Sequence, residues 1–169
     1  DWFLNKPEEA RYLLLQMKPG HIVGGPALFN MMLEFFRQFP EMKIGLQKNL
    51  KTLISIGAPY NLSTARQLKN ALGLELFNAF GTTETQMIFL NKPEKEKNFD
   101  PESMGSPLPG VTLRLEETEE EGIFDLFVKS PYQCKRVIGE EKEMAWFASG
   151  DMVTYDSATG ELKYAARKG

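Results

Sequence analysis

The chain has 169 residues, 42% of them hydrophobic and 25% charged, and its formal net charge is −3. This composition is typical of a globular protein with a real core, and the length allows one domain or two small ones. The 20 basic and 23 acidic residues give no basic surface for nucleic acid. No apolar run reaches the roughly 18 residues of a membrane span.

Cysteine and histidine each occur once, as Cys134 and His21. An internal disulfide and a thiolate metal cage are therefore excluded, and a catalytic cysteine is disfavoured because no histidine is near it in the sequence. A reducing compartment is the simplest interpretation, and we expect a cytoplasmic protein without a signal peptide. Because the chain begins at Asp1 without methionine, we expect a piece of a longer protein.

Residues 5–87 are predicted to alternate between helix and strand. A first helix over 7–17 opens at Pro7 and is expected to stop at Gly20. A short strand follows at 21–25. A second helix over 26–39 is apolar on most of its circumference, which indicates deep burial.

Residues 50–56 are predicted to form the next strand, which ends at Gly57-Ala58-Pro59. A helix follows over 61–73, with Asn61 or Ser63 as its N-cap and Gly73 after it. Residues 74–80 are expected to form another strand. Strand, helix and strand in this order favour a right-handed crossover and a parallel sheet.

After Lys92 the pattern changes to short alternating strands, at 111–117, 123–130, 146–156 and 160–167. The glutamate-rich run at 116–122 is expected to be a solvated hairpin tip, and 157–160 a turn. The sequence thus predicts an α/β fold with a parallel-sheet α/β subdomain over 1–91 and a small antiparallel β subdomain over 92–169.

A cluster of small hydroxyl side chains around one carboxylate, in Asn78–Met87 (NAFGTTETQM), follows the strand at 74–80. Ligands of open parallel sheets bind beyond the carboxyl ends of strands, so the loops at 57–59 and 81–84 are expected to face one crevice. The threonine hydroxyls could donate to phosphate oxygens, and Glu84 is an oxygen ligand of the kind that Mg²⁺ takes. Phe80 could stack on a base.

The same cluster has a second interpretation. Thr82 or Thr83 could cap a helix, with Glu84 in its first turn suiting the helix dipole. Phe80 is then an ordinary core residue. The stretch alone favours this second interpretation.

The order of several motifs resembles the adenylate-forming enzymes, the superfamily of acyl-CoA synthetases, luciferases and peptide-synthetase adenylation domains. The matching segments are LISIGAPYNLS, LELFNAFGTTET, SMGSPLPGVTLRL, WFASGDMV and ELKYAARKG. They occur in the family's order, with matching separations, over about residues 20–169. Each segment alone is weak, but together they overturn the helix-cap interpretation.

The resemblance implies a role for each matching residue. The nucleotide would contact Gly57, Ala58, Pro59, Asn78, Ala79, Phe80, Gly81, Thr82, Thr83, Asp151 and Arg167. Within this set Thr83 would hold the phosphate, Asp151 and Arg167 would approach the ribose, and Phe80 takes the place of the family's usual tyrosine. Glu84 would bind Mg²⁺, and Thr83 and Glu84 would be catalytic. The acyl pocket would be bordered by Gly25, Gly57, Gly81 and Thr82.

The resemblance also implies the reaction. The whole enzyme would activate a small-molecule carboxylic acid with ATP and Mg²⁺ and pass the acyl group to a thiol, with CoA as the expected acceptor. A carrier-protein thiol is the first alternative. The family's phosphate loop and its C-terminal domain lie outside this sequence, so the fragment alone should be inactive. Gly169 would lie at the interdomain hinge, or else be a frayed terminus.

Four departures from the family pattern support a second alternative, a degenerate homologue that binds a nucleotide or a partner. Phe124-Asp125 stands where the family has Gly-Glu, and Ser149 and Ala166 replace a threonine and a glycine. The family's Gly-Tyr has no clear match in the stretch PYQCKRVIG.

Overall fold

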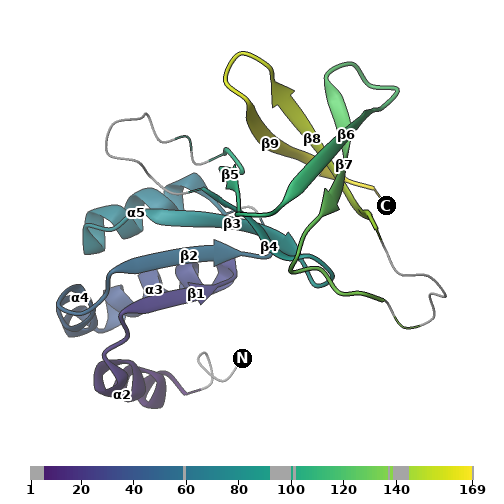
Figure 1. Cartoon of the computed structure of the whole chain (residues 1–169). Helices are drawn as coiled ribbons and strands as arrows, with labels where there is room; N and C mark the ends of the chain where they lie inside the picture. Colours follow the sequence, from purple (N-terminus) through teal and green to yellow (C-terminus); the bar gives the residue numbers. More distant parts are fainter. Residues whose placement is uncertain are drawn as a thin grey trace. The chain divides into compact units, whose positions relative to one another are not determined.

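The computed structural model describes residues 6–58, 60–91, 100, 102–136, 138 and 145–168. The chain divides into two compact units, Asp1–Phe77 and Asn78–Gly169. Figure 1 shows helices throughout the first unit, and strands and loops in the second. The units are described separately.

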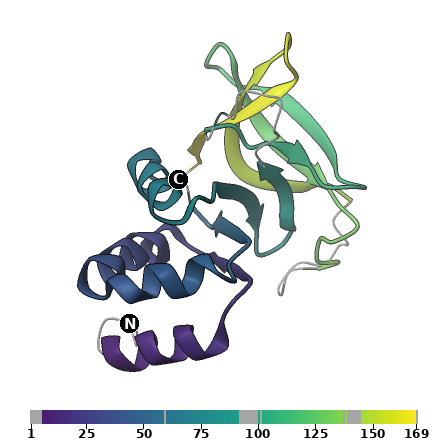
Figure 2. The same ribbon diagram turned by 90° about the vertical axis from the view of Figure 1, so that its left-hand side faces the viewer.

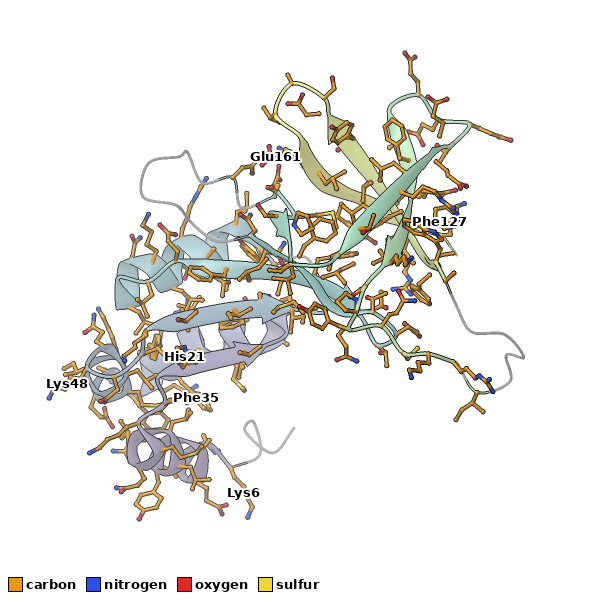
Figure 3. All side chains as sticks on the ribbon, viewed as in Figure 1. Lys6, His21, Phe35, Lys48, Phe127 and Glu161 are labelled. Atoms are coloured by element: carbon orange, nitrogen blue, oxygen red, sulfur yellow. The ribbon has the colours of Figure 1, made fainter. Side chains whose placement is uncertain are left out.

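The first unit packs helices against parallel strands. Its elements are α2 (Pro7–Met17), β1 (His21–Gly24), α3 (Pro26–Gln38), α4 (Pro40–Gln47), β2 (Thr52–Ile56) and α5 (Leu62–Leu72). β1 and β2 run parallel, with His21 opposite Thr52 and Gly24 opposite Ser55. α3 contacts both strands, α4 and α5, while α2 contacts α4 (Figure 2). The core includes Phe29, Leu53 and Leu68, each fully buried, and Phe35 of α3 (Figure 3).

Two helix ends show how local chemistry sets the boundaries. Asn61 caps α5, because its side-chain oxygen accepts a hydrogen bond from the Ser63 amide at 2.7 Å. α2 ends at Met17, which confirms the predicted range of 7–17, and Lys18 adopts a left-handed conformation with φ 48°. The stop signal is Pro19 and not the expected Gly20, since a residue before proline is disfavoured in the helical region.

The second unit consists of short antiparallel strands. β3 (Leu76–Thr82), which begins in the first unit, pairs with β4 (Gln86–Asn91), and β4 pairs with β5 (Ser106–Pro107). The other sheet has the order β6 (Thr112–Glu117), β7 (Ile123–Lys129), β8 (Phe147–Asp156) and β9 (Glu161–Arg167). Buried side chains of β4, β7, β8 and β9 form one core, which contains Ile88, Phe89, Leu126, Val128, Val153 and Leu162.

The predicted class, α/β followed by a separate small antiparallel sheet, is confirmed. The strands of the antiparallel sheet lie within one or two residues of the predicted ranges. The prediction of a wholly parallel first sheet is wrong, because β3 turns back directly into β4. α4, β4 and β5 were not predicted. The expected subdomain boundary between residues 91 and 92 stays a prediction, since 92–99 lie outside the described residues.

Candidate active site

The hydroxyl cluster forms the turn of the β3–β4 hairpin. Thr82 Oγ1 accepts hydrogen bonds from the backbone amides of Glu84 and Thr85, both at 3.2 Å. The Thr82 amide donates in return to Thr85 Oγ1 at 3.1 Å, and Thr85 is fully buried. Hydrogen bonds of the Thr82 and Thr85 hydroxyl groups to backbone amides therefore stabilise the turn. The helix start of the second interpretation is wrong, because residues 83–85 are a turn between antiparallel strands.

Gly81 is required by the close approach of the two strands. A Cβ atom at this position would lie 1.9 Å from the Gln86 carbonyl oxygen and 2.9 Å from Met87 Cα. The strand register shifts between Phe80 and Gly81, and Gln86 has a φ of 60°. Such a bulge next to a hairpin turn re-aims the side chains that follow it. The turn is thus a fixed, irregular element and not a loose loop.

Glu84 lies in this turn with its carboxylate ionised. The Thr82 hydroxyl, followed by the Glu84 backbone amide and the positive charge of Arg167, lowers the pKa of Glu84 below its ordinary value. Among the described residues Glu84 has no ion-pair partner within 4.0 Å, and the Thr83 hydroxyl has no hydrogen bond. An ionised carboxylate without an ion-pair partner among the described residues fits a single protein ligand of Mg²⁺, which usually takes one or two carboxylates plus phosphate oxygens.

Asp151 is a buried carboxylate in the middle of β8. Its side chain is 3% exposed, and Oδ2 has no hydrogen-bond partner among the described residues. Burial raises the pKa of Asp151, while Arg167 and the Ser149 hydroxyl act in the opposite direction. Ser149 Oγ donates to the Leu126 carbonyl at 2.9 Å and accepts from the Asp151 amide at 3.0 Å. A buried acceptor without a partner is uncommon, and it suits a ligand that donates hydroxyl groups.

Arg167 interacts electrostatically with both carboxylates. It is the register partner of Asp151 on β9, and its Nη1 lies 3.8 Å from Asp151 Oδ1. Its charge lowers the pKa of both Glu84 and Asp151. The second unit therefore brings Glu84, Asp151 and Arg167 into one electrostatic group, although the two carboxylates are 67 positions apart in the sequence (151 − 84).

The remaining predicted residues of β3 lie close to this group in sequence, and their roles stay predictions. Ala79 is buried, and Asn78 is half-buried opposite Asn91. Phe80 is half-buried and contacts two aromatic rings, with centroid distances of 6.1 Å to Phe89 and 6.3 Å to Tyr164. Such packing is that of a core side chain, and the base-stacking role of Phe80 stays a prediction.

The first unit holds the other predicted residues. Gly25 follows β1, and Gly57 and Ala58 follow β2, so the parallel strands bring them to the same edge. A Cβ on Gly25 would lie 3.8 Å from the Ile56 carbonyl oxygen. Gly57 has a φ of 94°, which favours glycine, and Gly57 and Ala58 are exposed. That these loops meet Glu84 and Asp151 in one crevice stays a prediction. Pro59 and Gly169 lie outside the described residues.

Three contacts near the site were not predicted from the sequence. Lys168 Nζ donates to Asp125 Oδ2 at 2.6 Å, and the Lys168 amide donates to the Gly150 carbonyl at 2.8 Å. The amide of Cys134 donates to the Glu84 carbonyl at 2.7 Å. Residue types give no signal for the two contacts made by backbone amides, whereas opposite charges at 125 and 168 are a weak signal for the ion pair.

Among the described residues, no helix has both the length and the apolar character that a membrane crossing requires. Groups of three or more histidine, cysteine, aspartate or glutamate side chains placed to hold a metal ion were also not found in the ranges that the structure describes.

The chain was compared with known proteins. Residues 3–131 match the model of the AMP-binding enzyme family. The 2-succinylbenzoate–CoA ligase of Lactococcus lactis subsp. lactis (strain IL1403) is 27% identical over 117 residues, which cover 66% of this chain and 25% of that enzyme. This chain thus spans about a quarter of that relative's length.

Solved structures share the fold. A malonyl-CoA ligase, in a ternary product complex with methylmalonyl-CoA and AMP, matches 95% of this chain and 36% of its own, with a TM-score of 0.75 and 23% identity. A benzoate CoA ligase from Burkholderia xenovorans LB400 matches 92% of this chain and 33% of its own, with a TM-score of 0.73 and 20% identity. Because the family model covers more than half of the chain, the chain belongs to the AMP-binding enzyme family, which confirms the adenylate-forming superfamily that its motifs resemble.

Proposed function

We propose that the full-length protein is an acid–thiol ligase of the acyl-CoA synthetase type. A carboxylate oxygen of the acid attacks the α-phosphorus of ATP and displaces pyrophosphate, and the thiol of CoA then displaces AMP from the acyl-adenylate. The observation that supports this most directly is the group formed by Glu84, Asp151 and Arg167, found in a chain that is similar to several CoA ligases.

Each member of the group has a proposed task. Asp151, whose Oδ2 is buried without a partner, would accept hydrogen bonds from the ribose hydroxyls, and Arg167 would lie beside the same ribose. Thr83 would donate its hydroxyl to a phosphate oxygen. Glu84 would hold Mg²⁺, which supplies charge neutralisation at the phosphates when it is bound. Asn78, Ala79, Phe80 and Gly81 would border the base.

The first unit would complete the site from its exposed loops. Gly57 and Ala58 are proposed to line the adenine, with Pro59 beside them. Gly25 and Gly57, together with Gly81 and Thr82, are proposed to border the acyl group. Small residues without bulky side chains let a flat or extended ligand approach the backbone.

The test is an assay of the full-length protein with ATP, Mg²⁺ and a panel of carboxylic acids. Pyrophosphate exchange that depends on one acid class, followed by thioester formation on addition of CoA, is the expected result. Exchange without transfer to CoA would indicate a carrier-protein thiol as acceptor. ATP binding without exchange for any acid would contradict the proposal and indicate a degenerate homologue.

We also propose that Gly169 lies at the hinge between this part of the enzyme and its C-terminal domain. Lys168, directly before it, is held by both Asp125 and the Gly150 carbonyl, so a pivot would begin where these bonds end. Gly169→Pro in the full-length enzyme should impair one half-reaction far more than the other, because proline fixes φ near −65°. Equal rates of pyrophosphate exchange and of thioester formation in variant and parent would contradict the hinge.

A further inference from the structure

A loop of the second unit reaches the outside of the Glu84 turn. The loop follows β7 and covers Ser130–Arg136. Its Cys134 amide donates to the Glu84 carbonyl oxygen at 2.7 Å, across 50 residues of sequence (134 − 84). This is a short hydrogen bond for an amide and a carbonyl, and it is the backbone contact between loop and turn.

Hydrogen bonds within the loop and to its neighbourhood hold the residues that precede this amide. The Ser130 amide donates to Gln133 Oε1 at 3.0 Å, and the Tyr132 amide donates to Ser130 Oγ at 3.0 Å. The Tyr132 hydroxyl donates to the Pro109 carbonyl at 3.1 Å, which ties the loop to the entry of β6. These bonds fix the backbone of the loop on the residues just before Cys134, whose amide donates to the Glu84 carbonyl.

The backbone of Glu84 is thereby hydrogen-bonded at both its amide and its carbonyl group. Thr82 Oγ1 accepts from the Glu84 amide on the inside of the turn, and Cys134 donates to the Glu84 carbonyl on the outside. With both ends of the residue fixed, the direction of its Cα–Cβ bond is fixed as well. Only the side-chain torsions of Glu84 remain free, so its carboxylate has fewer orientations to lose when it binds a ligand.

We propose that the backbone amide of Cys134 is a positioning contact for Glu84. The loop that carries it contains the first six residues, 131–136, of the stretch in which the family's Gly-Tyr has no clear match. This chain thus holds its turn with a segment that departs from the family pattern. The part of the proposal that concerns Mg²⁺ rests on the proposed function. The part that concerns the order of the turn does not.

The experiment compares three variants of the full-length protein. Cys134→Pro removes the amide hydrogen, whereas Cys134→Ala keeps it and removes only the thiol. Gln133→Ala removes the side-chain oxygen that accepts a hydrogen bond from the Ser130 amide. It perturbs the loop less than proline does, so it replaces Cys134→Pro in the test if the proline variant does not fold. Two quantities are measured: hydrogen exchange of the peptide that covers residues 82–87 in the metal-free protein, and the Mg²⁺ concentration that gives half-maximal pyrophosphate exchange.

Cys134→Pro should speed exchange in residues 82–87 by roughly five-fold, the factor that corresponds to one lost hydrogen bond of ordinary strength. It should raise the half-maximal Mg²⁺ concentration by a similar factor and leave the rate at saturating Mg²⁺ within about two-fold, since a positioning contact acts on binding. Gln133→Ala should change both quantities in the same direction, and Cys134→Ala should change neither.

A folded Cys134→Pro variant with the parent's exchange in residues 82–87 would overturn the proposal. So would unchanged exchange in Gln133→Ala where the proline variant does not fold. If Cys134→Ala changed hydrogen exchange and the half-maximal Mg²⁺ concentration as much as Cys134→Pro does, the effect would belong to the thiol. That result would also overturn the proposal. If the parent shows no pyrophosphate exchange at all, the proposed function fails, and hydrogen exchange alone then decides the positioning contact.

Discussion

Asp151 and Arg167 face each other as register partners on β8 and β9, 3.8 Å apart at Oδ1 and Nη1, and the carboxylate is 3% exposed whereas the guanidinium is 63% exposed. The two charged side chains therefore differ in how much water surrounds them. The arginine keeps most of its hydration, while the aspartate has lost nearly all of its own and keeps one oxygen atom without a partner. A buried charge that is only partly compensated destabilises the fold, so its presence in β8 favours a role in ligand binding.

Asp151→Asn should increase stability at neutral pH and weaken ATP binding. The pKa of Asp151 is raised in the folded chain, so its ionisation destabilises the fold above the ordinary aspartate pKa, and fully so above the raised one. The gain in melting temperature over the parent should thus be present at pH 7 and disappear as the pH falls below about 3.9, the pKa of an unperturbed aspartate. Loss of a charged hydrogen bond to the ribose should weaken ATP binding about 10- to 100-fold.

Arg167→Gln is the matched variant for this prediction. It removes the charge that lowers the pKa of Asp151, so the pKa rises further and the melting temperature at pH 7 should fall. The two substitutions thus move stability in opposite directions while both weaken ATP binding. Thermal unfolding at pH 3 and at pH 7, with titration calorimetry of ATP, measures both effects. Equal stability of Asp151→Asn and parent at pH 7 would contradict the explanation.

Glu84→Gln should reduce adenylation in the full-length enzyme by about a hundredfold or more, which corresponds to roughly 2.7 kcal/mol of transition-state stabilisation. Glutamine keeps the size and polarity of the side chain and removes the ionised oxygen. Since the backbone amide of Glu84 and not its carboxylate forms the bond that closes the turn, the fold should be unaffected. The measurement is pyrophosphate exchange against Mg²⁺ concentration, and a parent-like rate at saturating Mg²⁺ would exclude the metal role.

The antiparallel sheet was predicted well because alternation and turn residues describe an antiparallel strand directly. The Thr82–Glu84 turn was harder. A threonine hydroxyl that accepts from the amides two and three residues later caps a helix, and the same bonds from Glu84 and Thr85 to Thr82 close the hairpin here. Local sequence could not separate the two, because the outcome depends on whether the next residues pair with β3.

The site, too, was only partly predictable from the sequence. The order of the family's motifs predicted that Glu84, Asp151 and Arg167 belong to one nucleotide site, whereas composition and spacing alone did not. The Cys134 amide could not be predicted, because any residue other than proline carries that donor. Its contact with the Glu84 carbonyl depends on the path of a loop that has no secondary structure of its own.

Gly81→Ala should disrupt the hairpin. Its new methyl group would lie 1.9 Å from the Gln86 carbonyl oxygen, a backbone atom that cannot move without breaking the register of β3 and β4. We expect a loss of about 3 kcal/mol, the upper part of the range for overpacking. Gly20→Ala is the control, because there the nearest atom would lie 3.9 Å away and stability should change little. Chemical unfolding of both variants measures the difference, and a Gly81→Ala variant as stable as Gly20→Ala would refute the prediction.

The ion pair between Asp100 and Lys163 should make stability depend on pH at both extremes. Lys163 is the main cause that lowers the pKa of Asp100, and Asp100 in turn raises the pKa of Lys163. The stabilisation is therefore present between the two groups' ordinary values. It is lost as the pH falls through the lowered pKa of Asp100, and again as it rises through the raised pKa of Lys163.

Asp100→Asn tests this pair, because asparagine keeps an oxygen atom to accept the Glu102 amide bond and removes only the charge. The two side chains are 35% and 41% exposed, so solvent screens the pair and the loss at pH 7 should be about 0.5–1 kcal/mol. The difference from the parent should shrink below pH 4, where the aspartate becomes protonated. Glu119→Gln, which removes the same charge from an exposed turn, should change stability little at any pH. A constant difference between Asp100→Asn and parent from pH 7 down to pH 2 would show that the side chain acts through packing and not through its charge.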